Sequence, residues 1–347
     1  MDYAQYPRPV LEDVVRLRRQ MDRLNLPRKL VDRNVLVGTW NIRAFGPVHP
    51  RWEENPASPK RNLRAMAIIV EIIRRFDVVA IQEVKEDLSG LLLLMDWLGP
   101  DWGFIVTDTT AGSAGNTERL ACVFDRRRVR PSGLAGEIVL PPTDKGDPAQ
   151  QFARTPYLVG FQTGAEQFTL LTAHILYGKE PAERAGEISA LSRYVATELR
   201  SRSKSAPGQV DNLIVLGDFN IDKRGDDPLF RAFVADGLTV PKQLENLRTA
   251  FVGKKPKFYD QIAWFMGDFN LELNSAGVLD FADVIYPEVS AADLSFRVSD
   301  HLPLWAEFGL DHSGEQLARA LGLDDLPPDP ERLDPLDAVP EIGPRHR

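Results

Sequence analysis

The sequence predicts an α/β protein in which mixed β-sheets are covered by helices. Apolar strand-like runs recur along most of the chain, and segments with helical periodicity lie between them. The composition, 43% hydrophobic and 27% charged, is that of a globular protein and excludes a disordered or fibrous one. A chain of 347 residues can form two domains or one large α/β unit.

The first expected element is an amphipathic helix within residues 1–33. Apolar side chains recur there at helical spacing, and arginines fill the other faces; the apolar positions are Val10, Val14, Leu17, Met21 and Leu24. We interpret this segment as a helical extension packed on the main domain, in preference to a helix that binds a partner or nucleic acid.

The main domain is expected over residues 34–310. Its strands are predicted at VLVGTW (35–40), DVVAIQEV (77–84), WGFIVTD (102–108), RLACVFD (119–125), TPYLVGFQT (155–163), QFTLLTAH (167–174), NLIVLGD (212–218), FYDQIAWF (258–265) and LPLWAEF (302–308). Its helices are predicted from Leu63 to about Arg75, over 88–99 and over 182–200.

Residues 311–347 form a third region, an acidic and proline-rich tail. This region has nine acidic and four basic residues, and six prolines follow Leu323, so we expect a disordered or extended appendage. The start of the chain lacks the pattern of a signal peptide, and no apolar run approaches the roughly 20 residues of a membrane span. We therefore expect a cytoplasmic protein without a membrane span, in which Cys122, the one cysteine, fills the core.

The net charge of −8 limits how the protein can hold a phosphate-bearing substrate. A negative chain does not attract a polyanion through its whole surface, so the phosphates must meet local bases or a metal ion. The candidate local bases are Arg43, Lys60, Arg61, Arg64 and the cluster Lys254, Lys255 and Lys257. The run Arg126, Arg127 and Arg128 is interpreted as solvated surface.

Polar residues stand where apolar strands end, which is where open α/β sheets place their sites. They are Asn41, Glu83, His174, Asp218, Asn220, Asp300 and His301, accompanied by Glu118 and Asp260 in two further strand-like runs. One carboxylate in such a place is usually a helix cap or a surface residue, and one histidine is usually structural. The whole set is more informative than any member.

The types of residue in this set suit hydrolysis of a phosphate ester. Carboxylate and amide oxygens are ligands for a hard cation such as Mg²⁺, with Mn²⁺ as the other possibility. The chain has neither an HExxH motif nor a cysteine cluster, so the usual zinc sites are unsupported. Two histidines, each with a candidate acidic partner, suit proton transfer at a phosphate.

With these residues the sequence resembles the endonuclease/exonuclease/phosphatase superfamily, and within it the deoxyribonuclease I-like branch. The resemblance covers about residues 34–309 and rests on segments that occur in the family's order: WNIRAFG, RRFDVVAIQEV, TERLACVF, FARTP, TAH, GDFN, YDQI and SDHLP. It implies a four-layer α/β/β/α sandwich with two packed mixed β-sheets and the site at one edge.

The resemblance also implies a role for each residue. Glu83 would be the main metal ligand, with Asn41 beside it on metal or phosphate and Asp300 completing the metal side. His301, oriented by Asp260, and His174, paired with Glu118, would be the acid–base or phosphate-contacting histidines. Asp218 and Asn220 would position the nucleophile and stabilise the transition state, and Arg43 and Arg154 would contact phosphate.

Two further features of the sequence bear on the site and on the substrate. The motif GDFN occurs at 217–220 and again at 267–270; since the family has no catalytic GDFN at the second place, we interpret Asp268 and Asn270 as a turn. The arginine and tyrosine that deoxyribonuclease I inserts into a DNA groove correspond to Lys85 and Asn116, so cutting of duplex DNA in that style is in doubt.

The leading functional hypothesis is a Mg²⁺-dependent phosphodiesterase, namely an intracellular nuclease with nucleic acid as its substrate. The alternative within the same chemistry is a phosphatase or phospholipase acting on inositol phosphates or sphingomyelin. The alternative from another class is an inactive member that serves as a binding module.

Overall fold

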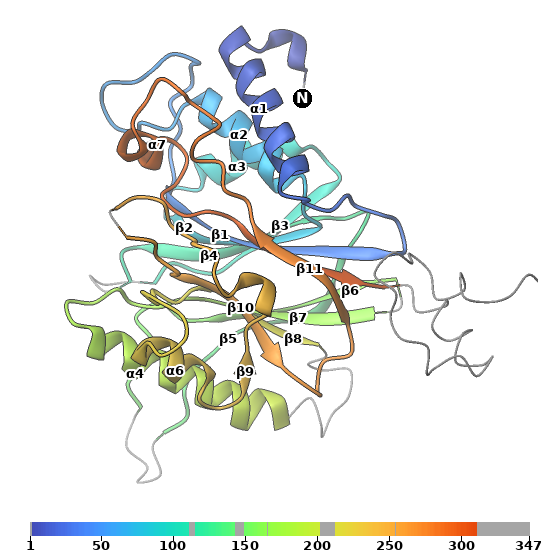
Figure 1. Ribbon diagram of the computed structural model, residues 1–347, viewed down its shortest axis with the longest axis vertical. Helices are drawn as coiled ribbons and strands as arrows, with labels where there is room; N and C mark the ends of the chain where they lie inside the picture. The colour runs from blue at the N-terminus through green and yellow to red at the C-terminus, as the bar shows by residue number, and fades with distance from the viewer. Residues whose placement is uncertain are drawn as a thin grey trace, which may run out of the picture.

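The computed structural model describes residues 2–110, 115–142, 149–164, 166–201, 212–253 and 255–310. Two six-stranded mixed sheets pack face to face, with helices on both outer sides (Figure 1). This arrangement confirms the predicted α/β/β/α sandwich. The tail 311–347 and Lys254 lie outside the described residues.

The first sheet has the strand order β11-β12-β1-β2-β4-β3. Its strands are β1 (Asn34–Phe45), β2 (Val78–Lys85), β3 (Trp102–Val106), β4 (Glu118–Asp125), β11 (Glu272–Val278) and β12 (Leu304–Gly309). The central pair β1 and β2 is parallel, and β12 and β4 flank it in the antiparallel sense.

The second sheet repeats this pattern with the order β5-β6-β7-β8-β10-β9. Its strands are β5 (Arg130–Glu137), β6 (Tyr157–Thr163), β7 (Glu166–His174), β8 (Leu213–Asp218), β9 (Leu238–Thr239) and β10 (Asp260–Phe265). Here β7 and β8 form the parallel pair, and β6 and β10 flank it in the antiparallel sense.

Helices cover the outer face of each sheet (Figure 1). On the side of the first sheet lie α1 (Arg8–Arg23), α2 (Leu63–Ile73), α3 (Ser89–Leu98) and α7 (Ala291–Arg297). On the side of the second lie α4 (Pro181–Tyr194), which continues as the π-helical turn η2 (Val195–Leu199), and α6 (Pro228–Val234). Short 3₁₀ turns occupy η1 (Tyr3–Gln5) and η3 (Lys242–Leu244).

Local chemistry explains where the helices begin. Asn62 caps α2 by accepting a hydrogen bond from the Ala65 backbone amide at 3.1 Å, and Ser290 caps α7 in the same way through Asp293. The predicted N-terminal helix is present: Val10, Val14, Leu17 and Met21 are buried, and α1 packs on α2. None of the helices in the described ranges is long and apolar enough to cross a membrane.

The core joins both sheets and the helices over the first sheet, and a smaller apolar cluster lies between the second sheet and α4 and α6. Cys122 is fully buried in β4, and burial raises the pKa of its thiol to about 12, as expected of a core residue. The parallel pairs β1–β2 and β7–β8 bring four strand ends to one edge of the sandwich. This edge is where the chemistry-bearing residues meet.

Candidate active site

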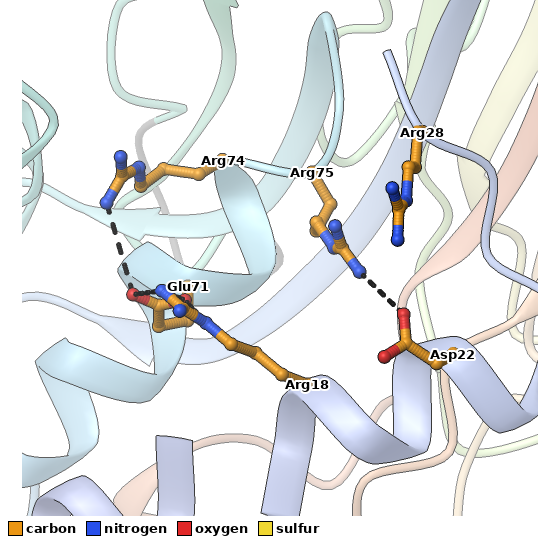
Figure 2. A pocket seen from close by; sticks show the side chains of 6 residues that line it. All are labelled: Arg18, Asp22, Arg28, Glu71, Arg74 and Arg75. Atoms are coloured by element: carbon orange, nitrogen blue, oxygen red, sulfur yellow. Dashed lines mark hydrogen bonds and ion pairs between the residues drawn. The ribbon is translucent and has the colours of Figure 1, made fainter. Parts of the chain in front are cut away.

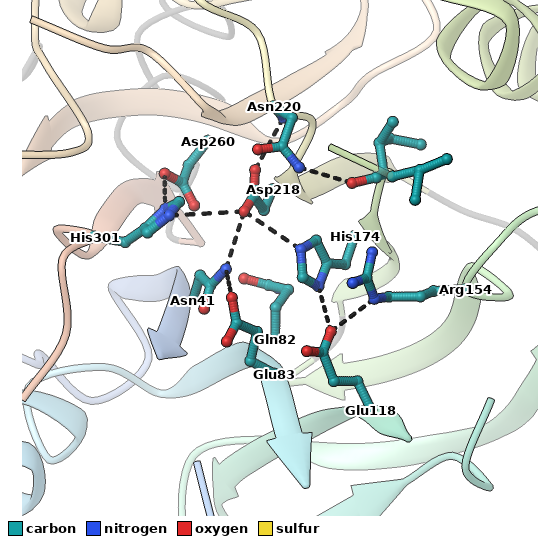
Figure 3. A network of polar contacts seen from close by, with 12 residues as sticks. Asn41, Gln82, Glu83, Glu118, Arg154, His174, Asp218, Asn220, Asp260 and His301 are labelled. Carbon is teal, nitrogen blue, oxygen red and sulfur yellow. Dashed lines mark hydrogen bonds and ion pairs between the residues drawn. The ribbon is translucent and has the colours of Figure 1, made fainter. Parts of the chain in front are cut away.

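Asp218 is the centre of the polar network at this edge (Figure 3). It is the last residue of β8 and is buried, and its Oδ2 accepts a hydrogen bond from Asn41 Nδ2 at 2.9 Å. The same oxygen lies 3.6 Å from His174 Nε2 and 3.8 Å from His301 Nε2. Burial would raise the pKa of Asp218, but the charges of the two histidines lower it, so the carboxylate is anionic.

His301 forms the first histidine–carboxylate dyad. Its Nδ1 lies 2.8 Å from Asp260 Oδ2, which leaves Nε2 directed toward Asp218. Burial favours the neutral ring, but the charges of Asp260 and Asp218 outweigh it and raise the pKa of His301 well above its usual value. The backbone is fixed as well, because Trp40 Nε1 donates to the His301 carbonyl at 2.9 Å.

His174 forms the second dyad, with Glu118. The distance from His174 Nδ1 to Glu118 Oε2 is 3.2 Å, and both side chains are buried. Burial alone would raise the pKa of Glu118, but its hydrogen bond to His174 and the charges of His174 and Arg154 lower it to about 2. Glu118 is thus a permanent anion that orients the ring.

Glu83 and Asn41 supply hard oxygen atoms beside Asp218. Asn41 Nδ2 donates to Glu83 Oε1 at 2.9 Å, and the Ala44 amide donates to Glu83 Oε2 at 2.8 Å. Asn41 Oδ1 is buried and accepts no hydrogen bond from a described residue. A buried acceptor without a partner next to two carboxylates fits a divalent cation such as Mg²⁺.

A second arrangement could also hold a cation. Asp218, Asp260 and His301 each offer a ligand atom within 4.8 Å of the others, and all three are buried. In this set His301 Nδ1 is already engaged by Asp260. Glu83 and Asn41 keep more of their oxygen ligands available, so they are the better match to a hard cation.

The backbone at the site adopts conformations that most residues avoid. Glu83 has a φ of 62° and Asn220 a φ of 52°, and the pairing of β1 with β2 is irregular between Asn41 and Phe45. The irregularity turns the Glu83 side chain toward the site edge, a common use of a bulge. At Gly217, with a φ of 131°, a Cβ would come within 2.1 Å of the Ala173 carbonyl oxygen.

Four predicted site residues are bound by other protein groups. Arg154 lies on Glu118, with Nε 2.6 Å from Oε2, and its side chain is 11% exposed. Arg43 and Asp300 face each other at 3.6 Å at the rim, and Arg43 also bonds Ser295. Asn220 uses its side-chain amide on the Ile175 carbonyl and its backbone amide on Asp218, so it braces the loop after β8.

Most of the other predicted local bases have structural partners, which corrects the expectation that they are available. Arg61 is buried and donates to the carbonyls of residues 43, 44, 297 and 298. Arg64 pairs with Asp13 and Glu288, and Lys257 pairs with Asp222. Lys85 and Asn116 both bond Glu118.

The expectation of solvated surface for the run 126–128 is wrong for Arg128. Its side chain is 10% exposed and binds Asp77 at 3.0 Å and the Asn34 carbonyl at 2.6 Å. The second GDFN is a turn after β10, as predicted, and its Asp268 pairs with Arg200.

Sequence reasoning missed Gln82, whose side chain connects the two sheets next to the site. Its Nε2 donates to Thr39 Oγ1 and to Thr172 Oγ1, both at 3.1 Å, and so links the first sheet to the second. The signal was present, because Gln82 is a polar residue inside the apolar run of β2. Ser299 was missed too; its hydroxyl donates to the Asn41 carbonyl at 2.7 Å and accepts from the His301 amide.

Comparisons with known proteins agree with this geometry. A deoxyribonuclease from Thioalkalivibrio sp. (strain K90mix) is 29% identical over 283 residues, which cover 78% of this chain and 70% of that protein. Deoxyribonuclease gamma from Rattus norvegicus is 26% identical over 299 residues, covering 79% of this chain and 84% of the relative.

The fold agrees with that of solved structures as well. The catalytic domain of human Nocturnin superimposes with a TM-score of 0.55 over 80% of this chain and 94% of that domain, at 17% identity. The model of the Endonuclease/Exonuclease/phosphatase family matches residues 38–301, a range that contains every residue of the two dyads. The chain therefore belongs to the endonuclease/exonuclease/phosphatase family.

Proposed function

We propose that the chain is a divalent-metal-dependent nuclease that hydrolyses the phosphodiester bonds of DNA. The observation that carries the proposal is the convergence of two histidine–carboxylate dyads on one anionic oxygen, Asp218 Oδ2, beside the oxygen set of Glu83 and Asn41. Relatives named deoxyribonuclease favour a nucleic acid substrate. A phosphodiester needs groups for the attacking water, the phosphoryl charge and the leaving oxygen.

The residues divide among these three tasks. Asp218, anionic and held by Asn41 and the Asn220 amide, orients the attacking water and accepts its proton as the water oxygen bonds to phosphorus. His301, kept protonated by Asp260 and Asp218, donates from Nε2 to a non-bridging phosphoryl oxygen. His174 donates a proton from Nε2 to the leaving oxygen, and Glu118 holds the ring through Nδ1.

Mg²⁺ bound by Glu83 and Asn41 would neutralise charge that develops on the phosphoryl group. The deep burial of Asn41 and Asp218 strengthens every electrostatic interaction of this kind. Arg43, at the rim beside Asp300, is placed to approach a neighbouring phosphate of a longer substrate. Arg154 acts as a positioning residue through Glu118.

The test offers the purified full chain, with Mg²⁺ or Mn²⁺, four substrates side by side: plasmid DNA, single-stranded DNA, RNA and a phosphomonoester. We expect DNA cleavage that EDTA abolishes and that falls by at least about 10²-fold in Glu83→Gln. Cleavage that continues in EDTA would refute the metal assignment. Hydrolysis of the phosphomonoester alone would replace the nuclease by a phosphatase, and no hydrolysis at all would favour a binding module.

A further inference from the structure

A basic pocket lies between α1 and α2, away from the site described above (Figure 2). It has a volume of about 370 Å³ and is lined by Arg18, Asp22, Arg28, Glu71, Arg74 and Arg75. Four guanidinium groups face two carboxylates, so the lining has a formal charge of +2. We call this cavity the arginine pocket.

The four arginines of the pocket lining share two carboxylates. Glu71 is buried and binds Arg18 at 2.9 Å and Arg74 at 4.0 Å, and Arg75 lies 3.6 Å from Asp22. The Nε of Arg75 donates to Met21 Sδ at 3.1 Å, although a thioether is a weak acceptor. The Arg28 guanidinium makes no hydrogen bond or ion pair with any other described residue.

The pocket lies at the opposite end of the central strands from the catalytic groups. Arg28 precedes the start of β1 at Asn34, and Arg75 precedes the start of β2 at Val78, whereas Asn41 and Glu83 lie farther along those strands. Arg18, Asp22 and Arg28 also precede the family region 38–301. Half of the lining of the arginine pocket is therefore supplied from outside the family region.

The last described residues, after which the acidic region 311–347 follows in the sequence, lie beside the loop that carries Arg28. Leu310, the last described residue, donates its backbone amide to the Arg33 carbonyl at 2.9 Å. Asn34 Nδ2 bonds both the Arg28 carbonyl, at 2.9 Å, and Glu307 on β12, at 2.7 Å. The strand that leads into the acidic region and the loop that carries Arg28 are thus direct neighbours.

We propose that the acidic segment around residues 324–341 of this chain docks into the arginine pocket. Residues 1–33 have five acidic and eight basic residues, and residues 311–347 have nine acidic and four basic residues, so the two additions have opposite charge. Arginine forms paired, charge-assisted hydrogen bonds with carboxylates. Asp324 and Asp325 follow Leu310 after a linker whose length allows a span of roughly 20 Å.

The acidic segment has an advantage over free anions in the pocket because it is covalently attached to the domain. A short linker gives the attached segment an effective concentration in the millimolar range, so even weak ion pairs keep it docked. A free phosphate-bearing anion would have to displace it. The segment therefore masks a basic surface that would otherwise hold polyanions at a place where no hydrolysis occurs.

The test measures the distance between two nitroxide labels on the full chain. One label is attached at Val15→Cys, on α1 one turn before Arg18, where the native residue is 46% exposed. The other is attached at Leu333→Cys in the acidic segment. Cys122 is fully buried and stays unlabelled. We expect a short-distance population in pulsed dipolar spectra that falls at least about threefold in Arg28→Glu and in the triple variant Asp324→Asn, Asp325→Asn, Asp329→Asn.

Arg23→Glu is the matched control, since it makes the same change of charge near the end of α1, outside the pocket lining. Its spectrum should equal that of the parent. An unchanged population in Arg28→Glu, or an equal fall in Arg23→Glu, would overturn the proposal.

Pyrophosphate binding in EDTA provides a second measurement that does not depend on catalysis. Pyrophosphate should bind about 10-fold more tightly to the variant with the neutralised acidic segment than to the parent. Arg28→Glu should remove this gain, because the gain comes from the arginine pocket. Equal affinity in the parent and the neutralised variant would show an open anion site instead, and would overturn docking of the segment.

Discussion

The chain has its own control for the role of Asp218, because GDFN occurs twice. Asp218 lies at the centre of the active-site network, whereas Asp268 pairs with Arg200 in a turn. We predict that Asp218→Asn lowers kcat by about 10²- to 10³-fold, since it removes the anion toward which both histidines point. Asp268→Asn should stay within about twofold of the parent in the same assay. Equal losses in the two variants would contradict the assignment.

Glu118 makes a prediction about stability and pH. Its pKa falls from 4.5 to about 2 on folding, so its stabilising contribution is complete above about pH 4.5 and is lost as the pH falls toward 2. Such a shift corresponds to roughly 3 kcal/mol. Urea unfolding of the wild type and of Glu118→Gln should therefore differ most above pH 4.5, and the difference should shrink toward pH 2. A difference independent of pH would show that the charge of Glu118 does not contribute.

The meeting of these polar residues at one edge could be predicted from the sequence, but the partners of the surrounding arginines could not. His174, His301, Asp218, Asp260, Glu118, Glu83 and Asn41 meet at one edge, as the strand-end pattern indicates. Whether an arginine is free or clamped depends on contacts between distant segments. Two of the four carbonyls to which Arg61 donates, those of residues 297 and 298, are more than two hundred residues away, and no local pattern reveals such contacts.

At the scale of single elements, Gly217 is required by the parallel pairing of β7 and β8. Gly217→Ala places a Cβ against the Ala173 backbone at a φ of 131°, so we predict a loss of about 3 kcal/mol in the free energy of unfolding together with lower activity. Gly267→Ala is the matched control, because its φ of 85° imposes strain but nothing lies within 4 Å of the added Cβ. It should lose only about 1 kcal/mol. Equal losses in urea titrations would refute the packing argument.

Buried strands were predictable, whereas β5 and β11, two edge strands, were not. The apolar runs of β1, β2, β4, β7 and β8 mark strands that are covered on both faces. β5, with the sequence RPSGLAGE, is mostly exposed and pairs on one side only, and β11 is also an edge strand. Edge strands do not need apolar side chains, so their sequences resemble loops.

At the scale of the whole molecule, the charge distribution predicts weak salt dependence. The net charge is −8, and Arg61, Arg64, Arg154 and Lys257 are engaged by protein groups. Few of the candidate local bases among the described residues therefore remain to displace counterions from DNA. A plot of log affinity against log salt, measured with Ca²⁺ in place of Mg²⁺, should have a slope of magnitude below about 3. A slope of about 6 or more would indicate a basic surface that these contacts do not account for.

Each dyad takes one member from each sheet. Glu118 of β4 holds His174 of β7, and Asp260 of β10 holds His301, which immediately precedes β12. Neither sheet alone contains a complete dyad of this kind. His301 is also synthesised 41 residues after Asp260 and is seated only when β12, the last strand of the domain, inserts between β1 and β11. Whatever ester the protein cleaves, a nascent chain that stops before His301 therefore lacks one of the two dyads on which the proposed chemistry depends.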